Sequence, residues 1–113
     1  MQFESITLPN AVTQFILSGR LDPAGTQAIE NSFAFASTAE TANIIVDLSG
    51  VDFIASIGIR LLMTSARGQA KKGGKLVLAS PQPLVRKVLE TAGIDLLVPL
   101  YADIEAACAD LAP

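Results

Sequence analysis

The clearest pattern of apolar and polar positions lies between Asn43 and Ala70. Asn43 to Leu48 is rich in β-branched side chains and does not alternate, which predicts a central strand covered on both faces. Ser49 and Gly50 are expected to end that strand. From Ser56 onward the apolar positions recur at spacings of three and four, which predicts a helix. Its expected core stripe is Ile59, Leu62, Met63, Ala66 and Ala70. The junction therefore brings the hydroxyl of Ser56 to the start of a helix.

The segment before this junction predicts a hairpin and a helix. Gln2 to Leu8 and Val12 to Leu17 both alternate and flank a Pro9-Asn10 turn, as in a two-stranded hairpin. A helix is expected to begin at Pro23, because Asp22 is a favourable N-cap and proline suits the first helical position. The inward side chains of that helix are expected to be Ala28, Ile29, Phe33, Phe35 and Ala36. Residues 37–41 are expected to loosen its end.

The segment after the junction repeats the alternation of strand and helix. Lys71 to Gly74 is expected to end the central helix, and Lys75 to Ala79 predicts a second buried strand. A helix near Pro83 is expected to turn Leu84, Val85, Val88, Leu89 and Ala92 inward and to be capped by Gly93. Leu96 to Tyr101 predicts an edge strand because it contains Pro99. Asp103 is the expected N-cap of a last helix from Ile104 to Leu111, with Cys108 on or near its apolar side.

This order predicts one α/β domain over residues 1–113. Each strand–helix–strand unit implies a right-handed crossover and parallel pairing. The first strand of the hairpin is the exception. The expected fold is a mixed sheet, parallel except for that strand, with helices packed against it.

Composition points to an intracellular setting. The chain has 113 residues, half of them apolar, which is enough for a core without covalent cross-links. Cys108 is the only cysteine, so no disulfide framework is expected and a reducing compartment is the simplest one. The N-terminal residues lack the features of a signal peptide, and no apolar run reaches the length of a membrane span. We therefore expect a cytoplasmic protein without membrane insertion.

The charges are unevenly distributed. The net charge is −3, yet seven of the eight basic residues lie between Arg60 and Lys87, an interval without an acidic residue. Such a run is typical of solvated helix faces, and it is also compatible with a docking surface for an acidic partner. Direct nucleic-acid binding is disfavoured because the whole chain is acidic and has no aromatic residues interleaved with the basic ones.

The residues that carry most enzyme chemistry are missing. The chain has no histidine, which excludes Ser-His-Asp and Cys-His nucleophile systems. No glycine-rich phosphate-binding motif is present. Asp47 and Asp52 could hold a magnesium ion, but capping of local N–H groups is the simpler interpretation. We expect no enzymatic activity, no catalytic residue, no metal site and no cofactor.

Ser56 and its neighbours are the candidate binding residues. Ser56 is expected to cap the helix, and the same N–H groups and helix dipole would accommodate a phosphate on its oxygen. Gly58 would let another backbone approach. Ile57 and Leu61 are expected to point away from the core stripe, on the side that adjoins Arg60, Arg67 and Lys71. Either another element covers these two apolar side chains, or they are scattered on the surface, or they anchor a partner between charged flanks.

The sequence D-L-S-G-V-D-F-I-A-S-I-G-I-R-L-L resembles the signature of the STAS domain, found in bacterial anti-sigma factor antagonists. S-G-R-L-D at 18–22, G-G-K-L-V-L at 73–78 and the segment 93–107 also have counterparts in that family. The resemblance implies a STAS fold, with a mixed, mostly parallel sheet of about five strands and about four helices. It also implies a signalling protein that regulates transcription by partner switching.

In that family the antagonist binds a serine-kinase anti-sigma factor until the kinase phosphorylates a serine at the helix start. The usual phosphoserine position is occupied here by Ile57, and Ser56 matches the preceding serine. Asp22 matches a family loop aspartate near the phosphosite. The resemblance thus implies partner binding through Asp22, Ser56, Ile57, Gly58, Arg60 and Leu61, with Ser56 the phosphorylation candidate.

Two other functions stay open. The chain could be a STAS subunit of a larger assembly that needs no phosphorylation, such as a lipid-transport ABC system. It could also be a nucleotide- or ligand-binding module that uses the same helix N-terminus.

Overall fold

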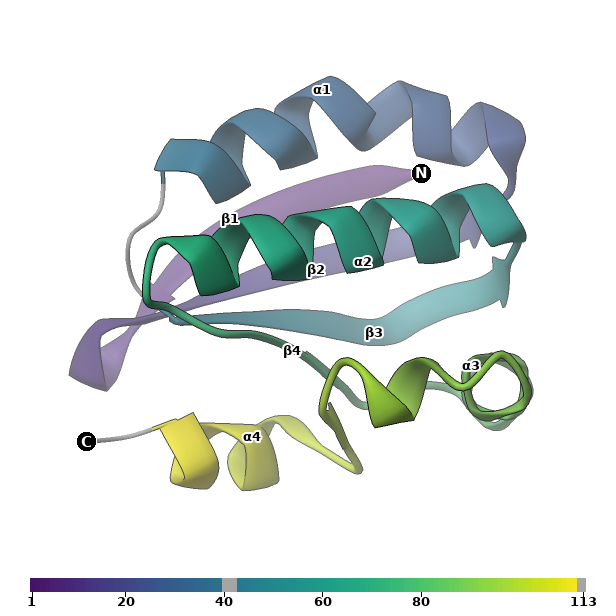
Figure 1. Ribbon diagram of the computed structural model, residues 1–113. Coiled ribbons are helices and arrows are strands. Elements are labelled where there is room, and N and C mark those ends of the chain that lie inside the picture. Colours follow the sequence, from purple (N-terminus) through teal and green to yellow (C-terminus); the bar gives the residue numbers. More distant parts are fainter. Residues whose placement is uncertain (40–42, 112–113) are drawn as a thin grey trace.

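The structure is a computed structural model that describes residues 1–39 and 43–111, apart from the side chain of Asn10. In this part of the chain five strands form one sheet in the order β1-β2-β3-β4-β5 (Figure 1). The strands are β1 (Gln2–Leu8), β2 (Val12–Leu21), β3 (Asn43–Ile54), β4 (Leu76–Ala79) and β5 (Leu100–Tyr101). β1 pairs antiparallel with β2, and the other neighbouring pairs are parallel. The predicted mixed sheet is confirmed.

Helices cover both faces of the sheet (Figure 1). They are α1 (Pro23–Ala39), α2 (Ser56–Lys71), α3 (Pro83–Thr91) and α4 (Ile104–Leu111), with short 3₁₀ turns η1 (Pro9–Ala11) and η2 (Ile94–Leu96). Ile44 and Val46 of β3 belong to the larger core cluster, which α1, α2 and α3 complete. Ile45, between them, belongs to a second cluster beneath α4. β3 is therefore covered on both faces, as its lack of alternation predicts.

Several helices begin and end at the residues that the sequence predicts. The Asp22 side chain accepts the N–H of Gly25 at 2.7 Å, and the Asp103 side chain accepts the N–H of Ala106 at 2.7 Å, so both aspartates cap helices. Gly73 and Gly93 follow α2 and α3 with φ of 85° and 75°, the left-handed conformation that suits glycine. The edge strand near Pro99 is also confirmed, although it spans only Leu100–Tyr101.

The expected end of β3 at Ser49 and Gly50 is wrong, because the strand continues to Ile54. A Cβ atom on Gly50 would lie 2.9 Å from the carbonyl oxygen of Leu17. The pairing of β2 with β3 shifts register at this contact, between Ile16 and Ser18, and again between Gly19 and Arg20. Gly50 therefore allows β2 to approach closely at an irregularity within the strand.

Several predicted inward positions are wrong. On α1, Ala28 and Phe35 are exposed, whereas the polar Thr26 and Ser37 are buried. On α2, Ala70 is exposed, and Ser65 and Gln69 are buried. Leu84 of α3 and Ala92, which caps the end of that helix, are exposed.

Contact between α1 and α2 explains part of this difference. Both helices lie side by side on one face of the sheet (Figure 1). Ser37 and Ser65 both line the surface between them, where small side chains let the helices approach. The expected loosening of α1 at residues 37–39 is also wrong, since the helix runs to Ala39, and residues 40–41 lie outside the described part of the chain.

Candidate functional site

The ends of β2 and β3 lie side by side at one edge of the sheet. Leu21, the last residue of β2, pairs with Ile54, the last residue of β3. The N–H of Ala55 donates to the carbonyl oxygen of Leu21 at 2.9 Å. The helices that follow these strands therefore begin next to each other, with Asp22 at the start of one and Ser56 at the start of the other.

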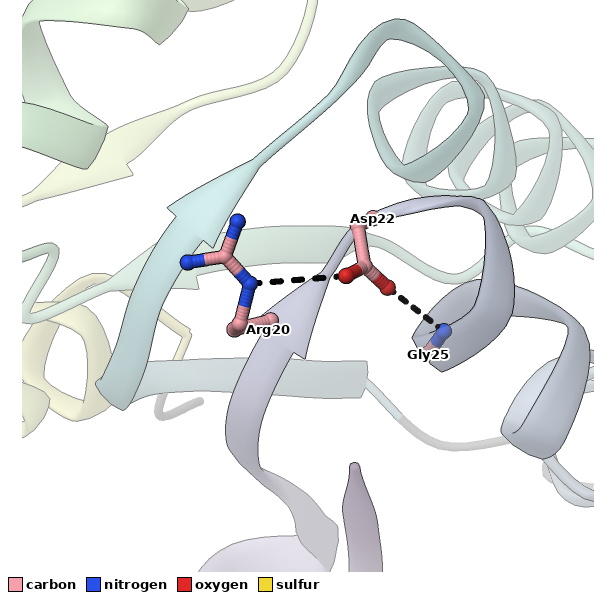
Figure 2. Close-up of polar contacts among 3 residues, drawn as sticks. All are labelled: Arg20, Asp22 and Gly25. Carbon is pink, nitrogen blue, oxygen red and sulfur yellow. Dashed lines mark hydrogen bonds and ion pairs between the residues drawn. The ribbon is translucent and has the colours of Figure 1, made fainter.

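Asp22 is held by two neighbours (Figure 2). One carboxylate oxygen accepts the N–H of Gly25 at 2.7 Å, and the other lies 3.4 Å from Nε of Arg20. The hydrogen bond from Gly25 is the main reason that the pKa of Asp22 lies below its ordinary value; partial desolvation opposes this shift, and Arg20 adds to it. Asp22 is therefore a negative charge fixed at the surface near neutral pH.

Arg20 connects this loop to β3, a role that the sequence analysis missed. Its guanidinium carbon lies 4.4 Å from the centre of the Phe53 ring, the geometry of a cation–π contact. Arg20 thus contacts both Asp22, which follows β2, and Phe53, near the end of β3. The alternation of β2 could have placed Arg20 at the strand end, but its partner on β3 depends on the register of the sheet.

The prediction that Ser56 caps α2 is wrong by one residue. Ala55 is the N-cap, with extended backbone angles of φ −104° and ψ 170°, and its side chain makes no cap hydrogen bond. Ala55 is fixed there because its N–H binds Leu21 and its carbonyl oxygen accepts the N–H of Ile59 at 3.1 Å. Ser56 is therefore the first residue of the helix, and its side chain is exposed.

Gly58 lies where α2 meets the end of β2. The glycine is buried, and a Cβ atom on it would lie 3.1 Å from the carbonyl oxygen of Leu21 and 3.3 Å from Cγ1 of Ile54. The expected close approach of another backbone is confirmed. Gly58 therefore supports the surface from below and does not itself form part of it.

The remaining residues of the first turns of α2 differ in their surroundings. Arg60 is exposed and Ile57 is half-buried. Leu61 packs against the larger core cluster, so the expectation that it points away from the core is wrong. α2 lies against α1 as well as against the sheet. More of its surface is therefore buried than the single apolar stripe in the sequence predicts.

A groove joins Ser56 to α3. It has a volume of about 420 Å³ and is lined by Ser56 and Ile59 from α2 and by Leu84, Lys87 and Val88 from α3. Leu84 is 63% exposed there. Gln82, just before α3, donates from its side chain to the carbonyl oxygen of Ser49 at 2.9 Å and ties this helix to β3. The sequence pattern did not identify Leu84, Lys87 and Val88 of α3 as neighbours of Ser56.

The carboxylate of Asp47 accepts one hydrogen bond from the neighbouring strand β2 and one from its own strand. Its two oxygens accept the side-chain N–H of Gln14 at 2.9 Å and the backbone N–H of Ser49 at 3.0 Å. Within residues 1–39 and 43–111, histidine, cysteine and acidic side chains form no cluster that could hold a metal ion. Within the same ranges, none of the helices combines the length and apolarity that a membrane crossing needs.

Comparisons with known proteins agree with this architecture. The family model described as "Mlab, STAS domain" matches residues 5–99. BtrV of Bordetella bronchiseptica, whose name describes it as an anti-sigma factor antagonist, is 30% identical over 93 residues, which is 82% of this chain and 80% of BtrV.

Solved structures show the same fold. A Thermotoga maritima protein, also described as an anti-sigma factor antagonist, superposes with a TM-score of 0.87 at 20% identity over 96% of this chain and 93% of its own. SpoIIAA of Bacillus, solved in its phosphorylated form, has a TM-score of 0.69 at 24% identity over 96% and 98% of the two chains. The family match and the identity to BtrV together establish that the chain belongs to the STAS domain family.

Proposed function

We propose that this protein is an anti-sigma factor antagonist that binds an anti-sigma factor at the edge where β2 and β3 end. The observation that carries the proposal is the pairing of Leu21 with Ile54, which sets the Asp22 loop beside the start of α2. The name of BtrV, at 30% identity, supports the same function. An antagonist needs a surface for its partner and no catalytic group of its own.

The proposed docking surface comprises Asp22, Ser56, Ile57 and Arg60, together with Leu84 and Lys87 of α3. Leu84 supplies an exposed apolar side chain and Ile57 a half-buried one. Asp22, Arg60 and Lys87 supply charges of both signs around them. Apolar anchors with a polar rim are the usual composition of a protein interface. Gly58 and Leu61 support this surface from within.

The partner in this proposal is a serine kinase that modifies Ser56. The hydroxyl is exposed and makes no cap hydrogen bond, so a kinase could reach it without unfolding the helix. A phosphate there would meet the N–H groups of the first helical turn, which have no partner within the helix, and the positive end of the helix dipole. Arg60 lies one turn further on, at the spacing that brings two side chains together. The added charge of about −2 would change the docking surface and release the partner.

Phosphorylation is tested by incubating the protein with the serine-kinase anti-sigma factor of the same organism and ATP, followed by intact-mass measurement. We expect the mass of one phosphate on the wild type and none on Ser56→Ala. Ser32→Ala, which changes an exposed serine of α1, is the matched control and should gain the phosphate. A gain that persists in Ser56→Ala would contradict Ser56 as the modified residue.

Docking is tested separately by calorimetric titration of the same anti-sigma factor. We expect Ile57→Asp and Arg60→Glu each to weaken binding at least tenfold, about 1.4 kcal/mol. Lys71→Glu, which makes the same charge reversal as Arg60→Glu at the other end of α2, should bind as the wild type does. Wild-type affinity for both surface variants would refute this docking surface.

A second candidate function is a STAS subunit of a larger assembly, such as a lipid-transport ABC system, that is never phosphorylated. Ile57, at the usual phosphoserine position of the family, favours it. Affinity purification from the source organism distinguishes the two. Recovery of an ATPase and a permease, with Ser56 unmodified, would favour the assembly subunit, whereas recovery of a serine kinase would favour the antagonist.

A further inference from the structure

An apolar groove lies between the second half of α2 and the segment that leads into β5. Its volume is about 370 Å³. One wall is formed by Met63, Ala66 and Ala70 of α2, the other by Leu97 and Pro99, and Leu76 of β4 lies between them. We refer to it as the α2–β5 groove.

The arrangement of helices leaves this groove open. α1 and α2 lie along the sheet, whereas α3 packs against β3 and η2 (Figure 1). Among the described residues that line the groove, none belongs to α1 or α3. The side chain of Leu97, at the wall of the groove, is 67% exposed.

Two cations lie at the rim of the groove. Arg67 and Lys75 are exposed and line it, and neither side chain takes part in an ion pair or hydrogen bond within the described residues. Among the described residues that line the groove, none is acidic. Asp95, in the neighbouring turn η2, is exposed and outside the lining. The groove therefore combines an apolar interior with positive charge at its mouth.

We propose that the α2–β5 groove binds a small amphipathic anion, an aliphatic chain that carries one carboxylate, as in a free fatty acid. Small-molecule sites have volumes from about 300 Å³ upward, mostly apolar linings and a few polar groups that fix orientation. In this groove Arg67 and Lys75 would pair with the carboxylate, and Met63, Leu76 and Leu97 would contact the chain.

This site is separate from the proposed docking surface. Ser56 begins α2 and Ala70 lies near its end, about 20 Å away along the helix. The two ends of α2 lie at opposite ends of the sheet (Figure 1). Binding in the groove therefore does not depend on the proposed antagonist function. A negative result for the docking surface would not bear on the groove, and the reverse also holds.

The test is an amide NMR titration of the full chain with sodium dodecanoate below its micelle concentration. We expect saturable shifts confined to residues 63–76 and 96–99, with a dissociation constant on the order of 100 μM. Dodecanol, which has the same chain without a charge, should bind several-fold more weakly. Shifts that are absent, or scattered over other apolar surfaces such as the one around Leu8 and Cys108, would overturn the proposal.

Variants separate the two parts of the site. Ala70→Phe fills the groove from an exposed helical position and should abolish the shifts while the protein stays folded by circular dichroism. The double variant Arg67→Gln and Lys75→Gln should weaken dodecanoate and leave dodecanol unchanged. Arg86→Gln on α3 removes a positive charge outside the groove and should have no effect.

Two results with these variants and probes would refute the proposal. One is wild-type binding of dodecanoate by both the Ala70→Phe and the double variant. The other is a response only to an acidic amphipathic helical peptide and not to dodecanoate, which would make the groove a protein-docking site.

Discussion

The carbonyl oxygen of Leu21 accepts a hydrogen bond of 2.9 Å from the N–H of Ala55. This bond joins β2 to β3 at the point where each strand gives way to a helix. Because it fixes Ala55 as the N-cap of α2, it leaves the hydroxyl of Ser56 outside the cap and exposed. The geometry of the proposed phosphorylation site therefore depends on a contact between two strands.

Gly58→Ala is expected to destabilise the protein at this junction. The added methyl carbon would lie 3.0 Å from Cβ of Leu21 and 3.1 Å from its carbonyl oxygen, so α2 would have to move away from β2. Overpacking of this kind lowers the free energy of unfolding by about 1–3 kcal/mol, even though alanine favours the helix. Urea denaturation followed by circular dichroism measures the change.

Gly68→Ala is the matched control on the same helix. Among the described residues, no atom outside the backbone of the helix itself and the two adjoining residues lies within 4 Å of a Cβ atom at position 68. Only the higher helix propensity of alanine therefore remains. The free energy of unfolding should rise by up to about 1 kcal/mol. A Gly58→Ala protein that is stabilised like Gly68→Ala would show that α2 does not press on Leu21.

Local chemistry in the sequence predicts most of the fold. Asp22 and Asp103 cap helices and Gly93 ends one, because each effect involves residues within one turn. Gly50 shows the limit of such reasoning. Glycine in a strand can mark either an end or a close approach, and only the position of Leu17 on β2 decides between them.

The place of Ser56 in the fold was predictable from the sequence, but its immediate surroundings were not. The spacing in the sequence places Ser56 at a helix start, but the cap falls on Ala55 because of Leu21, a residue of another strand. Phe35 and Leu84 fit an apolar stripe on their helices, yet both are more than half exposed. The helical spacing shows which side chains of a helix are apolar. Which face of the helix packs on the sheet is decided by tertiary contacts.

Leu61→Asp is expected to lower the free energy of unfolding, because Leu61 is not a surface anchor. The leucine packs against the larger core cluster. Its replacement by aspartate would remove these apolar contacts and leave a carboxylate with incomplete hydration. We expect the free energy of unfolding to fall by about 2 kcal/mol or more. Ile57→Asp, four residues earlier and outside the residues packed on that cluster, should cost much less. Equal thermal midpoints for the two variants would contradict this assignment.

Lys72→Met is expected to loosen the contact between α1 and the end of α2. The ammonium group of Lys72 donates to the carbonyl oxygens of Ser37 at 2.7 Å and Thr38 at 3.0 Å, in the last turn of α1. A cation at a helix C-terminus is favourable, and loss of these bonds should lower the free energy of unfolding by about 1 kcal/mol.

Lys71→Met is the control for that change. Lys71 is exposed, and its side chain makes no ion pair or hydrogen bond within the described residues. Its replacement should alter the free energy of unfolding by less than about 0.5 kcal/mol. The same loss in both variants would mean that the bonds of Lys72 to α1 do not contribute to stability.

Tyr101 and Asp110 should make stability depend on alkaline pH. The hydroxyl of Tyr101 donates to a carboxylate oxygen of Asp110 at 2.6 Å. This hydrogen bond, with desolvation and the charge of Asp110, raises the pKa of Tyr101 above its ordinary value of about 10. Because the folded pKa is the higher one, the stabilising effect is complete below about pH 10 and is lost as the pH rises through the folded pKa.

The phenolate absorbance reports this titration directly, since Tyr101 is the only tyrosine in the chain. Asp110→Asn removes the charge and weakens the acceptor, so the midpoint should move back toward the ordinary value. The variant should also lose less stability than the wild type above about pH 10, because its tyrosine ionises at a pH closer to that of the unfolded chain. Coincident titration curves for the two proteins would show that the Asp110 contact does not hold the proton on Tyr101.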